Sequence, residues 1–171
     1  MDFFKVIESR YSHRESYTSA PVPKEDVIKI MDAGLRAPSG CNAQTTSFVV
    51  VTNAEKRKAL AEIVPCDAIL TAPVLIIGVS EKVTFDFGLD FEVEDYSAAV
   101  ENILLAATAM GYASCWFDGT CRLNGNDAAI AKVLGISEGK NVRTILTLGV
   151  PEVVGKQAHR KPLEERVTWV E

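Results

Sequence analysis

The chain has 171 residues, enough for one domain with a hydrophobic core, and no Pro/Ser-rich linker or break in composition divides it. Its formal net charge is −5, and its basic residues are scattered among the acidic ones, which argues against nucleic acid as a partner. The N-terminus lacks the layout of a signal peptide and the longest apolar runs are too short to span a bilayer, so we expect a single-domain cytoplasmic protein, residues 1–171, with no membrane partner.

The cysteines and histidines offer little for a metal site. None of the four cysteines forms a C-x-x-C pair, and only His13 and His159 could help them hold a metal. No spacing suggests a Cys-His or Ser-His-Asp nucleophile, although such sets can also assemble in space. We therefore expect no metal, and expect any redox or transfer chemistry to belong to a bound cofactor.

The first half of the chain alternates between helical and strand-like patterns. Asp2 can cap a first helix, and a second begins near Pro23 and stops before Pro38. Residues 47–52 and 73–80 are branched, nearly uninterrupted apolar runs, as expected of strands covered on both faces. An amphipathic helix over 54–64 separates them, which indicates a covered sheet.

The second half centres on a long apolar helix. Residues 94–110 are helical in propensity and apolar most of the way round, which predicts a central, buried helix. Residues 113–117 and 142–150 resemble two more strands, with a short helix over 126–134 between them. The tail ends in a fifth strand-like piece, "RVTWV", which could reach a second subunit.

Arg10, Ser12 and Arg14 occupy every second position just after the first predicted helix. In an extended chain these side chains point to one side, so two guanidinium groups and a hydroxyl could converge on a phosphate. The alternative is that cations follow a helix because they suit its negative C-terminal end, and face water.

The stretch "APSGCNAQ", residues 37–44, joins the second helix to the first strand. Pro38 ends the helix and Gly40 permits a tight turn, so Ser39, Asn42 and Gln44 could be held together with several exposed backbone N–H groups. A planar heterocycle with amide edges would suit such a loop. The alternative is an ordinary turn built from the usual turn residues.

Two further segments carry weaker signals. In "CWFDGT" a strand ends at a turn whose backbone N–H could face a ligand, although Trp116 and Phe117 could equally be core residues. In "HRKP", Arg160 and Lys161 precede a proline, and such adjacent cations are commonly surface residues.

Taken together, these segments resemble the FMN-dependent nitroreductase family. "SRYSHRES" is similar to its R-x-S-x-R motif, "APSGCNAQ" to its P-S-x-x-N-x-Q loop, "DYSAAVENILLAATAMGYASCW" to its central helix, and "LGVPE" with "HRKPLEERV" to its closing segment. The resemblance covers nearly the whole chain in the family's order. It implies an α+β fold, with a mixed β-sheet flanked by helices, and an intertwined homodimer with FMN at two interface sites.

The resemblance also implies roles for individual residues. FMN would be bound by residues of the first motif, of the loop, of the turn after "CWF" and of the closing segment: Arg10, Tyr11, Ser12, Arg14, Pro38, Ser39, Gly40, Asn42, Gln44, Asp118, Gly119, Arg160 and Lys161. The loop would come from the other subunit, and the turn would place a backbone N–H near flavin N5. The flavin itself would take hydride from NAD(P)H, so no catalytic side chain is expected.

The chain departs from the family pattern in two places. The family's loop commonly continues as Q-P-W, whereas this chain has "QTTSF", which weakens the assignment of Gln44. The segment between the second strand and the central helix is short, and its Phe85, Phe87 and Phe91 could form an aromatic lid over the flavin and substrate pocket, or pack as core or dimer contacts.

Three functions fit these expectations. The first is an oxidoreductase that uses FMN and NAD(P)H to reduce a small-molecule acceptor such as a nitroaromatic or quinone. The second keeps the fold and FMN but performs another redox reaction, such as reductive dehalogenation or flavin breakdown. The third is a flavin carrier or sensor without significant turnover.

Overall fold

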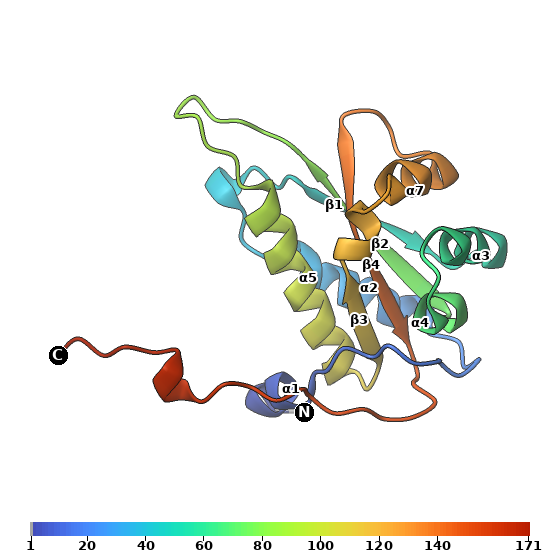
Figure 1. Ribbon diagram of the computed structural model, residues 1–171, viewed down its shortest axis with the longest axis horizontal. Coiled ribbons are helices and arrows are strands. Elements are labelled where there is room, and N and C mark those ends of the chain that lie inside the picture. Colours follow the sequence, from blue (N-terminus) through green and yellow to red (C-terminus); the bar gives the residue numbers. More distant parts are fainter. Residues whose placement is uncertain (1) are drawn as a thin grey trace.

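The structure is a computed structural model that describes residues 2–171, and it is organised around a four-stranded antiparallel sheet (Figure 1). The strands are β1 (Thr46–Val51), β2 (Val74–Glu81), β3 (Ala113–Phe117) and β4 (Lys140–Gly149), in the spatial order β1-β2-β4-β3. The helices are α1 (Phe3–Ser9), α2 (Lys24–Leu35), α3 (Ala54–Ile63), α4 (Asp67–Thr71), α5 (Glu92–Ala109), α6 (Gly119–Arg122) and α7 (Asn126–Leu134), with short 3₁₀ turns η1 (Gly40–Asn42) and η2 (Leu163–Glu165).

Side-chain caps define where two of the helices begin. The Asp2 carboxylate accepts hydrogen bonds from the backbone N–H groups of Phe4 and Lys5, as the sequence predicts for α1. The Asn53 side chain does the same for α3, accepting from the Lys56 N–H at 2.9 Å. Each cap satisfies donors that have no acceptor within the helix.

The alternation of side chains along the strands divides the core into two layers. On β2, Leu75 and Ile77 point to one face and pack with α3, α4 and α7, whereas Val74 and Ile76 point to the other and pack with α2 and α5. Figure 1 shows α5 on one side of the sheet and α3, α4 and α7 on the other. Both faces of β2 are therefore covered, which explains its continuous apolar run.

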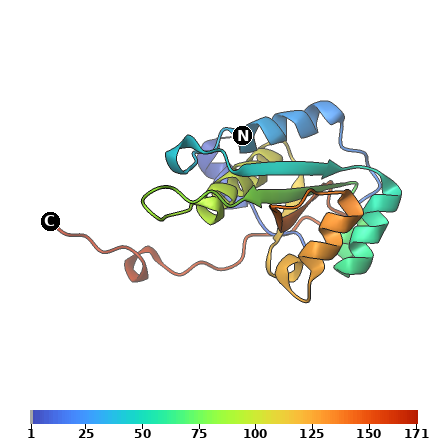
Figure 2. The same cartoon turned by 90° about the horizontal axis from the view of Figure 1, so that it is seen from above.

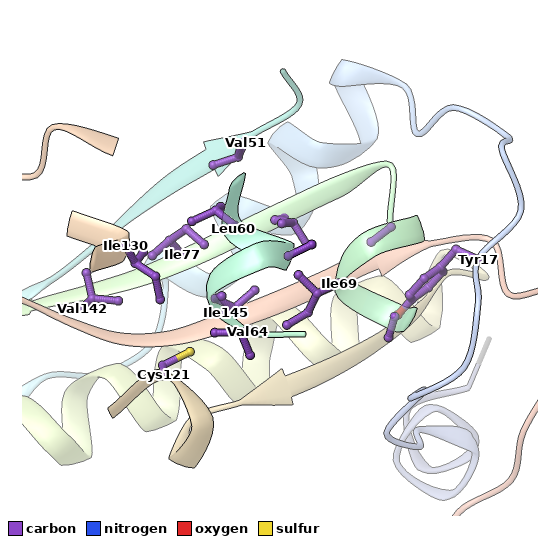
Figure 3. Close-up of a cluster of buried hydrophobic side chains, with 14 of the residues drawn as sticks. Tyr17, Val51, Leu60, Val64, Ile69, Ile77, Cys121, Ile130, Val142 and Ile145 are labelled. Atoms are coloured by element: carbon purple, nitrogen blue, oxygen red, sulfur yellow. The ribbon is translucent and has the colours of Figure 1, made fainter. Parts of the chain in front are cut away.

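Figure 3 shows the first of these layers in detail. Leu60 of α3, Ile69 of α4 and Ile130 of α7 meet Ile77 and Ile145 of the sheet, and all five side chains are fully buried. Burial of one such side chain stabilises the fold by roughly 1.5 to 3 kcal/mol. This layer holds the sheet rigid beneath the opposite face, on which α5 lies.

The expected α+β architecture, with helices flanking a sheet, is confirmed. The paired strands of the sheet are antiparallel, and the parallel pairing among residues 2–171 is an isolated bridge between Ser12 and Ser114. The sheet is therefore antiparallel, and not the mixed sheet that the resemblance implies. The "RVTWV" piece, expected as a fifth strand, is unpaired, and the C-terminal segment extends away from the body (Figures 1 and 2).

Among the described residues, 2–171, no helix combines the length and apolar character needed to cross a bilayer.

Candidate functional site

The first half of the site is a pocket between the segment after α1, the middle of α5 and the end of β3. It has a volume of about 390 Å³. Four of the predicted FMN-binding residues line it: Arg10, Ser12, Asp118 and Gly119. Glu101, Leu104 and Trp116 complete the lining. Segments about 100 residues apart in sequence are thus brought together.

Arg10 is fixed in this pocket from two sides. It follows α1 with an extended backbone, and its side chain is only 16% exposed, with Nε 3.4 Å from a carboxylate oxygen of Glu101. The Gln157 side-chain amide donates to the Arg10 backbone carbonyl at 3.1 Å. Ser12, two residues on, is held by its bridge to Ser114 beside β3. Both side chains line the same pocket, as the alternating pattern predicts.

The turn at Asp118 is held by its own carboxylate. Tyr96 of α5 donates its hydroxyl to Asp118 Oδ2 at 2.6 Å, and Arg122 donates through Nε to Oδ1 at 2.6 Å. Burial and the hydrogen bond to Asp118 raise the pKa of Tyr96, so the phenol stays a donor. Because the carboxylate is occupied, the backbone is the part of the turn free to meet a ligand. Gly119 begins α6, and its N–H has no acceptor within that helix.

Trp116 lines the pocket, but its indole donor is buried. Its indole Nε1 is buried and has no hydrogen-bond partner within residues 2–171, and its ring packs edge-on against Tyr96. A buried donor without an acceptor is costly, and because Nε1 is itself buried it is not among the donors that the open pocket presents. Trp116 also packs against the hydrophobic core on the α5 side of the sheet, which is the alternative role that the sequence offered.

The second half of the site is the loop over residues 37–44, beside a hollow of about 210 Å³. Pro38, Ser39 and Gln44 line this hollow, and the Ser39 hydroxyl accepts a hydrogen bond from the Gln44 N–H at 3.0 Å. Asn42 lies in the 3₁₀ turn that follows Ser39. The predicted loop residues are therefore gathered, although Gln44 adopts a left-handed backbone with φ 51°.

Phe85, Phe87 and Phe91 form one aromatic cluster next to this loop. The rings of Phe85 and Phe87 are stacked with centroids 5.3 Å apart, and Phe91 lies 5.8 Å from Phe85. Phe91 also packs on Gly40, where an added Cβ would lie 2.2 Å from a ring carbon. The cluster thus touches the predicted flavin loop, while most of Phe87 remains exposed.

The two half-sites lie on opposite sides of α5. Asp95 lines the hollow at the loop, whereas Leu104 lines the Arg10 pocket nine positions later, which is about two and a half turns of helix. Their side chains therefore face opposite directions. Within one chain the two half-sites are separate pockets that share no lining residue.

The remaining predicted residues lie elsewhere. Tyr11 lines a separate groove together with Gly155 and Gln157, and Arg14 is exposed and does not line the Arg10 pocket. Arg160 and Lys161 are exposed and do not line that pocket, and the C-terminal segment that carries them extends from the body (Figure 1).

Sequence reasoning missed the acidic and aromatic residues of α5 that hold both half-sites: Asp95, Tyr96 and Glu101. For Asp95 the available signal was a charged residue in an otherwise apolar helix, because buried charges need partners. This signal does not extend to Tyr96, which is uncharged, or to Glu101, whose side chain is half exposed.

Comparison with known proteins identifies the family of this chain. Residues 7–68 and 64–150 match the model of the nitroreductase family. The chain belongs to this family. The resemblance seen in the sequence is thereby confirmed.

Individual relatives agree with this assignment. The chain is 34% identical over 149 residues to an Archaeoglobus fulgidus protein provisionally named NADH dehydrogenase/NAD(P)H nitroreductase, covering 86% of this chain and 84% of the relative. It is 30% identical over 161 residues to the NADPH-flavin oxidoreductase of Vibrio harveyi, covering 86% and 66%. The crystal structure of an FMN-dependent nitroreductase from Clostridium difficile R20291 matches with a TM-score of 0.83 at 27% identity, over 98% of this chain and 99% of that one.

Proposed function

We propose that this protein is an FMN-dependent oxidoreductase that uses NAD(P)H to reduce nitroaromatic, quinone or similar electron-poor acceptors, and that it acts as a homodimer. The observation that supports this most directly is the division of the predicted flavin residues into two half-sites on opposite sides of α5. Family membership and the names of the relatives agree with an NAD(P)H-dependent flavin oxidoreductase.

The pocket at Arg10 fits FMN chemically. Its lining provides a guanidinium group from Arg10, a hydroxyl from Ser12 and a backbone N–H from Gly119. FMN offers acceptors to such donors in its carbonyl edge and its phosphate. The donor set therefore matches an acceptor-rich, anionic ligand, and Glu101 balances the Arg10 charge while no anion is bound.

Bound FMN would supply the redox chemistry, taking hydride from NAD(P)H and passing electrons to the acceptor. The residues of this chain would bind and orient. Arg10 and Ser12 would hold the polar edge or the phosphate, and the Gly119 N–H would face the flavin ring. Pro38, Ser39, Asn42 and Gln44 would approach from the partner subunit. The Phe85, Phe87 and Phe91 cluster would provide an apolar surface for a flat acceptor.

Exposed apolar side chains support the homodimer. Phe3 is 63% exposed and Phe4 70% exposed on α1, and Trp169 of the C-terminal segment is also largely exposed. Large apolar side chains that gather on a surface mark interfaces. In a dimer, the C-terminal segment would bring Arg160 and Lys161 to the phosphate of the partner's flavin.

The proposal is tested on the purified protein. We expect it to be yellow, to release FMN on acid treatment, as identified by chromatography, and to oxidise NAD(P)H faster when nitrofurazone or menadione is added. Recovery of FAD, or no flavin binding with excess FMN, would contradict the cofactor assignment. FMN binding without acceptor-dependent turnover would instead indicate a flavin carrier.

A further inference from the structure

The loop over residues 37–44 holds an unusual backbone. Three of its residues that are not glycine, Cys41, Asn42 and Gln44, have φ values of 51°, 55° and 51°. Left-handed backbone is unfavourable for most L-residues because Cβ crowds the following carbonyl oxygen, although asparagine adopts it more readily. Such conformations persist only where surrounding contacts impose them, and they gather at functional sites. Contacts from outside the loop must therefore maintain its conformation.

Asp95 provides contacts at both ends of the strained segment. Its side chain projects from the first turn of α5, and the residue is only 4% exposed. Oδ1 accepts a hydrogen bond from the Gly40 N–H at 2.8 Å, and Oδ2 accepts one from the Thr45 hydroxyl at 2.7 Å. Gly40 and Thr45 flank the three left-handed residues, so one carboxylate fixes both sides of the segment.

No cation pairs with Asp95 within residues 2–171, so its charge is satisfied by the loop itself. A buried carboxylate needs strong donors, and it binds them more tightly than a neutral group would. The dependence is mutual. The loop supplies the hydrogen-bond donors that the buried carboxylate needs, and the carboxylate maintains the left-handed conformation of the loop.

We propose that Asp95 is a positioning residue that holds the loop over residues 37–44 in the conformation that serves the flavin of the partner subunit. The role rests on the proposed function. Asp95 lines the hollow beside Ser39 and Gln44 and acts through the loop, so its removal should weaken flavin binding and turnover without removing a flavin contact.

An acidic residue in a first helical turn is also favoured by the helix dipole, which would require no role in the loop. Glu92 separates the two explanations. It lies in the same first turn, is 6% exposed, accepts from Ser80 at 2.9 Å and pairs with Arg143. Because it bonds strands and not the loop, Glu92→Gln is a matched control for the loss of a buried carboxylate on α5.

The first test is amide hydrogen exchange of the full-length protein without flavin. In Asp95→Asn we expect the amide exchange rate of peptides covering residues 38–46 to rise at least tenfold, whereas the exchange rate of peptides from the central strands should not change. Glu92→Gln should leave residues 38–46 as in the wild type. Thr45→Val, which removes one of the two bonds and keeps the side-chain shape, should give an intermediate rise and serves if Asp95→Asn fails to fold.

The second test is FMN affinity and steady-state kinetics of the same variants. Asp95→Asn should bind FMN at least tenfold more weakly, with a smaller effect in Thr45→Val, and kcat at saturating FMN should fall while Glu92→Gln stays near the wild type. Unchanged exchange over 38–46 would overturn the proposal, and so would faster exchange with unchanged FMN affinity. If the wild type, which keeps Asp95, bound no FMN, the proposed function itself would be wrong. This outcome is distinct from the two outcomes that contradict the role of Asp95.

Discussion

Arg10 is the residue on which we expect the proposed FMN site to depend most. Its guanidinium group is mostly buried in the pocket, and a charge-assisted hydrogen bond contributes about 1.5 to 3 kcal/mol. We therefore predict that Arg10→Ala weakens FMN binding about ten- to a hundredfold, measured by flavin fluorescence quenching. Arg10→Lys should recover only part of this, because an ammonium group lacks the planar fork.

Riboflavin provides the control for Arg10. If Arg10 contacts the phosphate, riboflavin should bind the wild type poorly and be much less sensitive than FMN to Arg10→Ala. If Arg10 contacts the flavin edge, both ligands should lose affinity to a similar extent. Wild-type affinity for FMN in both Arg10→Ala and Arg14→Ala would show that neither arginine binds the cofactor.

Tyr112 provides a test of the fold that is independent of the flavin. Its hydroxyl donates to Asp26 at 2.7 Å, and this bond, with burial, raises the pKa of Tyr112 to about 12. A pKa raised in the folded state stabilises the fold fully below the ordinary value, near 10, and the contribution is lost as the pH rises through about 12. The wild type should therefore lose free energy of unfolding between pH 10 and 12 more steeply than Tyr112→Phe in urea titrations. Parallel curves would refute the assignment.

At the scale of elements, the loop over residues 37–44 packs against Phe91 at the start of α5, and this contact limits the size of the side chain at position 40. An added Cβ on Gly40 would lie 2.2 Å from the Phe91 ring, and overpacking of this kind typically costs about 1 to 3 kcal/mol. We predict that Gly40→Ala lowers the free energy of unfolding by that amount and weakens FMN binding.

Removal of the ring supplies the control for this contact. In the double variant Gly40→Ala with Phe91→Ala, the clash with the ring is removed and the Cβ of residue 91 remains at 2.6 Å, so the loss from Gly40→Ala should be smaller than in the wild-type background. Chemical denaturation of the four proteins gives the coupling energy. Additive losses would show that the Phe91 ring does not limit position 40.

The sequence predicts well those elements whose hydrophobic pattern continues along their whole length. The apolar runs of β2 and β4 reflect burial on both faces, and the length of α5 follows from its apolar periphery. The short helices α4 and α6, of 5 and 4 residues, were not predicted because they are too short to show a helical period.

The functional residues divide in the same way. The Arg10 and Ser12 pattern and the loop over residues 37–44 could be read from local spacing. The bond from Gly40 to Asp95 spans 55 positions and the bond from Tyr96 to Asp118 spans 22, so local patterns could not reveal them. "RVTWV" has a strand-like pattern, but it pairs with no strand among residues 2–171, and a local pattern does not show whether a strand finds a partner.

At the scale of the whole molecule, the C-terminal segment is expected to hold the dimer together. It extends from the body with few buried side chains, so it has little to gain from order in a lone chain. A truncation before Pro162 should lose both the dimer, seen by light scattering after size exclusion, and the bound flavin. A truncated monomer that kept full FMN occupancy would contradict this role.

The claim that each flavin site is shared by two chains is tested most directly with mixed dimers. One chain carries Arg10→Ala and the other Gly40→Ala, each with its own affinity tag, and heterodimers are isolated by tandem purification. With shared sites, one site contains both changes and the other is wild type, so titration should find one FMN per heterodimer bound with wild-type affinity. If each site lay within one chain, both sites would carry one change, and the absence of any wild-type-affinity site would contradict the account.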